Sequence, residues 1–232
     1  NCRRSSSGGS MTPSLVTFTE AGTDATFGLQ FWTTSSGTVA SIATPAHTGP
    51  RSISFDSGGA NGVAYVQKDG LFADAGGRVS VYVRLRDLPT AASAGLLAIR
   101  SSTTSVLEVR VTSGGVLQLA SGGTQIGTNG STLSTGVWYR LCLAYTLTST
   151  TVNQTRLFLD GNIDISVSNA TLAGTGTQHL RVGWINAPGA NRVFYADDIF
   201  SDSAPGLADT RDIWVTAKLP TQANNNGFDT TG

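Results

Sequence analysis

Charge is scarce in this 232-residue chain, and the scarcity excludes several classes of protein. Asp, Glu, Lys and Arg make up only 13% of the residues, and the formal net charge is zero. The basic residues are scattered, so no patch that neutralises nucleic-acid phosphates is predicted. No run of about 18 apolar residues occurs, so no membrane-spanning segment is predicted. We therefore expect neither nucleic acid nor a membrane as a partner.

Cysteine and helix signals are also sparse. Two cysteines are too few for a disulfide framework. Cys142 is expected to act as a small hydrophobe within a strand, with a bridge to Cys2 as the alternative. No segment combines a 3.6-residue apolar repeat with helix caps, so no helix is predicted. No apolar signal-peptide core is present, and Met11 is a candidate native start.

The chain is rich instead in glycine, serine and threonine, and short segments alternate between apolar and polar residues. Alternation is clearest in residues 136–166. There, one face of the first run consists of Tyr139, Leu141, Leu143, Tyr145 and Leu147. Period-two alternation predicts a half-buried antiparallel strand. Asp160 and Gly161 follow a second such run and predict a tight hairpin, because both central positions of a type I′ turn require positive φ.

Similar segments along the chain predict a two-sheet antiparallel sandwich. The predicted strands are residues 15–19, 38–43, 51–55, 62–67, 78–85, 95–100, 106–112, 116–119, 124–126, 138–147, 155–160, 178–184, 192–200 and 213–217, with a short return strand after Gly161. Residues 27–32 are predicted to be a loop or an edge strand. We expect one domain over residues 15–217. Residues 1–14 and 218–232 are polar and are predicted to be a flexible tail and a linker.

The order of these segments resembles the laminin-G-like, or concanavalin A-like, jelly-roll superfamily. The resemblance rests on the strand that begins with Trp138, the next strand ending at Asp160-Gly161, and the short polar return. It implies an all-β jelly-roll sandwich with Trp138 in the core. The start VTFTEAG and the end FYADDIFSDS are similar to modules of phage structural proteins. That similarity implies an extracellular or virion-surface location.

Enzymes also use this fold, but the residues that they need are sparse here. The chain has only two glutamates, and the Glu-x-Asp-x-Glu strand of glucanases with this fold is missing. Glu108 with Arg110, and Gln178 with His179, resemble alginate-lyase motifs only faintly. Glu108 and Arg110 are predicted to lie on a solvated strand face. No Gly-x-Ser-x-Gly motif occurs. We expect no catalytic residues, with a polysaccharide hydrolase or lyase as the less favoured alternative.

Sugar binding requires exposed aromatic rings and planar polar groups. Tyr82 and Arg84 are predicted to face outward from residues 78–85, which makes them candidate ligand contacts. Trp184 and Asn186, at the loop NAPGAN, are the other candidates. Trp184 shares its parity with the apolar residues of its strand, so a place in the core is the alternative. His47 lies in a turn-rich loop and is predicted to be solvated.

The late acidic pair Asp197 and Asp198 is the candidate metal site. Adjacent strand residues point to opposite faces, so the two carboxylates are not expected to share a proton. In jelly-roll binding modules with a similar Tyr-x-Asp-Asp motif, one Asp and an early acidic residue hold Ca²⁺. The resemblance therefore implies a structural calcium ion bound by Glu20 with Asp197 or Asp198. The alternative is that these residues cap strands or pair with arginines.

The leading functional hypothesis is a non-catalytic surface module within a larger extracellular or virion assembly. Its partner would be a glycan, another surface polymer or another subunit. A purely structural virion or decoration protein without a small ligand is the alternative. An exposed cluster of aromatic residues would favour glycan binding.

Overall fold

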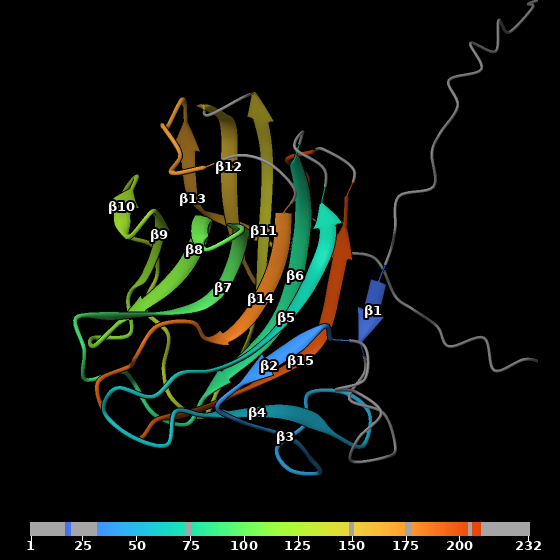
Figure 1. Cartoon of the computed structure of the whole chain (residues 1–232), viewed down its shortest axis with the longest axis vertical. Helices are drawn as coiled ribbons and strands as arrows, with labels where there is room; N and C mark the ends of the chain where they lie inside the picture. Colours follow the sequence, from blue (N-terminus) through green and yellow to red (C-terminus); the bar gives the residue numbers. More distant parts are fainter. Residues whose placement is uncertain are drawn as a thin grey trace, which may run out of the picture.

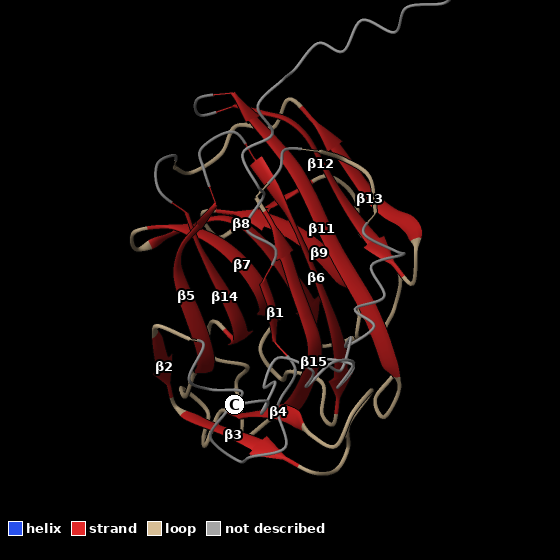
Figure 2. Ribbon diagram, turned by 90° about the vertical axis from the view of Figure 1, so that its right-hand side faces the viewer, coloured by secondary structure: helices blue, strands red, loops and turns tan. Residues whose placement is uncertain are grey.

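The structure, a computed structural model, describes residues 17–19, 32–72, 76–148, 151–174, 178–203 and 206–209. Within these ranges the chain forms strands and loops, with no helix (Figures 1 and 2). This part of the chain accordingly contains no helix that is long and apolar enough to cross a membrane. The strands form two antiparallel sheets packed as a sandwich, as predicted from the sequence.

One sheet has eight strands. Its spatial order is β13 (Asn162–Ser168), β12 (Thr151–Leu159), β11 (Trp138–Thr148), β6 (Gly76–Leu85), β15 (Val193–Asp202), β4 (Ser52–Asp56) and β3 (Thr38–Ile42), and β1 (Thr17–Thr19) also pairs with β15. Non-consecutive strands such as β6, β11 and β15 are neighbours, so the chain crosses repeatedly between the sheets. Both figures show β1 beside β15.

The second sheet has seven strands. Its spatial order is β10 (Thr124–Ile126), β9 (Leu117–Ser121), β8 (Thr104–Thr112), β7 (Ser93–Ser101), β14 (Gln178–Trp184), β5 (Ala64–Phe72) and β2 (Thr34–Ser36). The strand β14 has the bounds predicted from its alternation. The strand β2 was not predicted, because its Thr-Ser-Ser sequence carries no apolar alternation.

The core lies between the sheets and follows the predicted alternation. In β6, Val79, Val81, Val83 and Leu85 are fully buried, whereas the outward Tyr82 is partly exposed. The facing sheet contributes fully buried residues that include Leu97, Ile99, Val109, Leu119 and Val182. Burial of so many aliphatic and aromatic side chains supplies the main driving force for folding.

The hairpin between β12 and β13 confirms the turn prediction. Asp160 and Gly161 have φ angles of 48° and 89°, and Leu159 pairs with Asn162 across the turn. Positive φ at both central positions matches the right-handed twist of the flanking strands. The predicted segments 27–31 and 213–217, and both predicted tails, lie outside the described residues.

The core position predicted for Trp138 is wrong. Trp138 pairs in register with Arg84 of β6, on the outer face of the eight-stranded sheet, and it is only partly buried. Its parity is that of Arg140, whereas Tyr139 and Leu141 face the core. The alternation of the strand therefore correctly predicts that Trp138 faces outward, whereas the resemblance to other jelly rolls wrongly predicts that it lies in the core.

Candidate functional site

The predicted ligand residues Tyr82 and Arg84 lie on the outer face of the eight-stranded sheet, but each already has a partner. The imidazole of His47 stacks on the Tyr82 ring, with 3.6 Å between centroids and 16° between planes. The same imidazole lies edge-on to Trp138 at 5.7 Å. Arg84 Nε donates a hydrogen bond to the Gly136 carbonyl at 2.8 Å. His47 is thus not the solvated loop residue that was predicted, and one face of Tyr82 is covered.

Two carboxylates hold the segment that carries His47. Asp197 Oδ2 accepts hydrogen bonds from the backbone N–H groups of His47 and Thr48, at 2.8 and 3.2 Å. Asp198 Oδ2 lies 2.8 Å from His47 Nδ1, and Asp198 Oδ1 accepts a bond from the Thr48 hydroxyl at 2.5 Å. Burial, with a smaller contribution from Asp198, raises the pKa of Asp197 to about 6.

The expectation that Asp197 and Asp198 face opposite sides is wrong. A β-bulge between Asp197 and Phe200 interrupts the pairing of β15 with β6, and Asp198 has a φ of 47°. A bulge inserts an extra residue and turns a side chain that regular alternation would send to the other face. Both carboxylates consequently reach the same segment, His47 and Thr48.

The predicted calcium site lies only partly within the described residues. All four carboxylate oxygens of the acidic pair face hydrogen-bond partners in His47, Thr48 or the Asp198 backbone N–H. Within the described ranges, no group of three or more His, Cys, Asp or Glu residues is arranged to hold a metal ion. Glu20, the third predicted ligand, lies outside these ranges, so calcium binding stays a prediction.

The other two predicted ligand residues have structural roles. Trp184 is fully buried, and its Nε1 donates to the Arg192 carbonyl at 3.0 Å. The prediction that Trp184 contacts a ligand is therefore wrong, and its alternative, a place in the core, is confirmed. Asn186 Oδ1 accepts a hydrogen bond from Gly95 N at 2.6 Å, which ties its loop to β7.

Glu108 and Arg110 do not form the solvated face that was predicted. Glu108 is only 3% exposed, and its Oε1 accepts a hydrogen bond from Arg110 Nε at 2.8 Å. Gly95 makes room for this carboxylate, because a Cβ there would lie 2.4 Å from Glu108 Oε1. The charge of Glu108 is balanced by its neighbour two positions along β8.

A candidate site that the sequence did not reveal lies on the outer face of the seven-stranded sheet. We call it the arginine face, and it consists of Tyr65, Gln67, Arg100, His179 and Arg181. The register of β14 brings these residues together, because it places Arg181 opposite Gln67 of β5 and His179 opposite Arg100 of β7. Alternation alone predicts that each residue points outward, but it does not predict which strands are neighbours.

Arg181 is fixed at the centre of the arginine face. Its Cζ lies 3.7 Å from the centroid of the Tyr65 ring, in a cation–π contact. Its Nε and Nη2 donate to Gln67 Oε1 at 3.0 and 2.5 Å. Burial, and next the charge of Arg100, lower the pKa of Arg181 to about 10.

Arg100 forms no direct ion pair with a described carboxylate, although the effect of burial on its pKa is partly offset by the charge of Glu108. Its guanidinium donates to the Ser105 hydroxyl at 3.4 Å and to the Thr103 carbonyl. Burial lowers the pKa of Arg100, and its Nε has no hydrogen-bond partner. Among the described residues, neither Arg100 nor Arg181 has a carboxylate oxygen within 4.0 Å. Two partly buried, like-charged guanidinium groups thus lie on neighbouring strands, and neither forms an ion pair with a described carboxylate.

His179 lies beside these arginines. Its Nδ1 is 2.9 Å from Asp69 Oδ1, although the two groups are not aligned as a hydrogen bond. The only other carboxylate close to the arginines in the described structure is Glu108, which is occupied by Arg110. The arrangement can therefore hold an anion, with a ring and an amide beside it.

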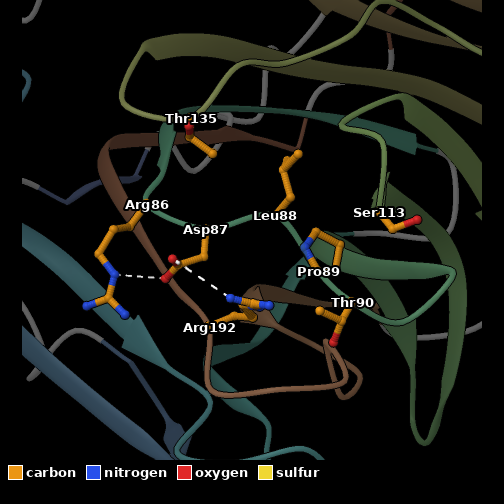
Figure 3. A pocket seen from close by; sticks show the side chains of 8 residues that line it. All are labelled: Arg86, Asp87, Leu88, Pro89, Thr90, Ser113, Thr135 and Arg192. Atoms are coloured by element: carbon orange, nitrogen blue, oxygen red, sulfur yellow. Dashed lines mark hydrogen bonds and ion pairs between the residues drawn. The ribbon is translucent and has the colours of Figure 1, made fainter.

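A pocket of about 400 Å³ opens at one end of the sandwich (Figure 3). It lies where the loop between β6 and β7 meets the residues just before β15. Its lining consists of Arg86, Asp87, Leu88, Pro89, Thr90, Ser113, Thr135 and Arg192. This pocket lies next to the NAPGAN loop, since Thr90 N donates to the Pro188 carbonyl at 2.8 Å.

Comparison with known proteins supports the fold. No family model and no curated protein matches the chain. Among solved structures, an endo-β-1,4-glucuronan lyase from the fungus Trichoderma reesei is similar, with 13% identity and a TM-score of 0.60 over 76% of this chain and 92% of the lyase. The cellulose-induced protein Cip1 has 17% identity and a TM-score of 0.57 over 75% of this chain and 89% of Cip1.

A mutant of the Trypanosoma rangeli sialidase that displays trans-sialidase activity is also similar, with 16% identity and a TM-score of 0.53. The match covers 72% of this chain but only 27% of the sialidase chain. All three likenesses are to β-sandwich folds, and at these identities they show the fold alone.

Proposed function

We propose that this chain is a non-catalytic, glycan-binding domain whose arginine face recognises carboxylated sugars. The observation that carries the proposal is the pair Arg100 and Arg181, two partly buried guanidinium groups without a carboxylate partner in the described structure. Guanidinium groups bind carboxylates through paired, charge-assisted hydrogen bonds. A bound carboxylate would offset the repulsion between the two arginines.

The surroundings of the two arginines suit a sugar polymer. Arg181 covers one face of the Tyr65 ring, and the Gln67 amide bonds to Arg181 and to Asp69. A sugar unit would therefore pack beside this fixed group, with its hydroxyls and carboxylate accepting hydrogen bonds from the arginines. A face that extends across β5, β14 and β7 can contact successive sugar units. The similar lyase acts on a glucuronan, a polymer of carboxylated sugars, which supports this choice of ligand class.

We propose binding without turnover because Glu108, a carboxylate on this face that could move a proton, is buried and neutralised by Arg110. General acid–base catalysis needs such a group within hydrogen-bond reach of the substrate. A location at an extracellular or virion surface, where such polymers are met, is part of the same proposal.

The test compares two oligosaccharides with the same β-1,4 linkage, an oligoglucuronate and a cello-oligosaccharide of equal length. Calorimetric titration should show binding of the oligoglucuronate, weakening as salt is added, and little binding of the neutral oligomer. Arg181→Gln should weaken oligoglucuronate binding about ten- to a hundredfold, since hydrogen bonds to charged groups contribute roughly 1.5–3 kcal/mol. Arg100→Gln should have a similar effect.

Arg84→Gln, on the other sheet, is the matched control and should change the affinity by less than about twofold. If Arg84→Gln weakens binding and Arg181→Gln does not, the site is at Tyr82 and Arg84, as the sequence predicts. Release of unsaturated uronates that stops in His179→Ala would show a lyase. No binding of any carboxylated glycan would favour the purely structural role.

A further inference from the structure

The pocket of Figure 3 is separate from the arginine face, and its walls are fixed by hydrogen bonds between loops. Arg86 N and Asp87 N donate to the Val193 carbonyl at 3.0 and 3.2 Å. Arg192 N donates to Ser57 Oγ at 2.9 Å, and its carbonyl accepts the Trp184 indole N–H. A pocket formed in this way is present before any ligand arrives, which lowers the entropic cost of binding.

Three charged side chains gather on one side of the pocket (Figure 3). Arg86 Nε donates to Asp87 Oδ2 at 2.8 Å, and Val193 N donates to the same oxygen at 3.2 Å. Among the described residues, Asp87 Oδ1 accepts no hydrogen bond, and Arg192 Nη1 lies 4.0 Å from it. The Arg192 guanidinium makes no other polar contact among the described residues, and its Nε has no hydrogen-bond partner. Two cations, Arg86 and Arg192, thus share the Asp87 carboxylate. The Arg192 guanidinium can still donate hydrogen bonds, and Asp87 Oδ1 can still accept them.

The rest of the lining is apolar or carries hydroxyl groups. Leu88 and Pro89 supply aliphatic surface, and three hydroxyl side chains complete the lining, from Thr90, Ser113 and Thr135. The pocket is shallow and widely open to solvent, and its volume of about 400 Å³ includes this broad mouth. That size suits one or two sugar units rather than a long stretch of polymer.

We propose that this pocket binds a single uronate residue, such as the end of an acidic glycan chain. The uronate carboxylate would accept hydrogen bonds from Arg192 and Arg86, which carry the net positive charge. Adjacent sugar hydroxyls would donate to Asp87 Oδ1, which accepts no hydrogen bond in the described structure. The C–H face of the ring would pack on Leu88 and Pro89. This inference shares its ligand class with the proposed function but uses a different site.

The test uses methyl β-glucuronide and methyl β-glucoside, which differ only in the carboxylate. Both are titrated into the Arg100→Gln/Arg181→Gln protein, in which the arginine face is disabled. Backbone amide chemical shifts locate the binding. We expect the glucuronide to shift the amide signals of residues 86–90 and 192–193. It should bind at least about tenfold more tightly than the glucoside, because tenfold corresponds to the lower limit for the contribution of one hydrogen bond to a charged group.

Arg192→Gln in the same background should abolish the preference for the glucuronide, and Arg192→Lys should restore part of it. The fold should survive both changes, because only the backbone of Arg192 bonds to Ser57 and Trp184. Lack of glucuronide binding in the disabled background, or an unchanged preference in Arg192→Gln, would overturn the pocket proposal. Neither result would change the test of the proposed function, because the oligoglucuronate titrations use a protein in which Arg100 and Arg181 are both present.

Discussion

Arg78 and Arg140, on the outer face of the eight-stranded sheet, and Arg100 and Arg181, on the outer face of the seven-stranded sheet, differ in how they are neutralised. Arg78 pairs with Asp202, and Arg140 pairs with Asp209 at 2.5 Å. Residues 206–209 also accept a hydrogen bond from Arg156 Nη1, at the Leu207 carbonyl at 3.5 Å. On the seven-stranded sheet, Arg110 pairs with Glu108, whereas Arg100 and Arg181 contact only hydroxyl, carbonyl and amide oxygens and a ring.

This difference separates arginines that stabilise the fold from arginines that are available to a ligand. An arginine paired with a buried carboxylate is part of the folded structure, and removing it leaves an uncompensated charge. An arginine that is desolvated without a counter-ion stabilises the fold less, because its charged form is disfavoured. The second kind is the one that an external carboxylate can satisfy.

The largest effect should follow from breaking an ion pair on the eight-stranded sheet. Arg78→Gln removes the guanidinium that pairs with Asp202, a residue that is only 5% exposed. We expect the free energy of unfolding to fall by about 3 kcal/mol, as for other buried pairs that lose one member. Urea denaturation monitored by fluorescence measures this change.

Arg181→Gln is the comparison variant on the seven-stranded sheet. It should change the stability by less than about 1 kcal/mol, because it removes a repulsive charge along with its hydrogen bonds. Equal losses of stability in Arg78→Gln and Arg181→Gln would contradict the proposed difference between an arginine paired with a buried carboxylate and one without such a pair.

The ionisation of Asp197 should change the free energy of unfolding with pH, by as much as or less than the loss expected for Arg78→Gln. The pKa of Asp197, about 6 in the folded chain, lies above the usual value of 3.8, so the folded chain retains a proton that the unfolded chain releases. The contribution of Asp197 to stability should therefore be fully present below about pH 4 and be lost as the pH rises through about 6. The loss is at most about 3 kcal/mol.

Asp197→Asn isolates this contribution from the other titrating groups. The unfolding free energy of this variant, relative to that of the unaltered protein, should rise between pH 4 and pH 6, because only the unaltered protein loses stability as Asp197 ionises. Above about pH 7 the difference should stay constant. A difference that does not depend on pH would mean that Asp197 titrates at its ordinary value.

The smallest effect should come from removing calcium. Because His47, Thr48 and the Asp198 backbone already engage the carboxylates of Asp197 and Asp198, we expect a chelator to leave the melting temperature unchanged. A bound ion would behave differently, since a hundredfold excess over its dissociation constant stabilises a protein by about 2.7 kcal/mol. A melting temperature that falls with chelator and recovers with Ca²⁺ but not Mg²⁺ would establish the site predicted from the sequence.

Much of the strand architecture could be predicted because it depends on local rules. Alternation in residues 78–85 identified the core residues Val79, Val81 and Val83, and Asp160-Gly161 identified a turn, since each signal lies within a few neighbouring residues. The polar strand β2 carried no such signal. Trp138 shows that the local rule was also more reliable than the resemblance to other jelly rolls.

The sites depended on which strands became neighbours, and that is a property of the tertiary structure alone. Arg100 and Arg181 are 81 positions apart in the sequence, and only the pairing of β7 with β14 brings their charges together. The bulge in β15 likewise turned Asp198 toward His47, although regular alternation would separate it from Asp197. Alternation determines which side of a strand a residue occupies, whereas long-range pairing and its irregularities determine what that residue meets.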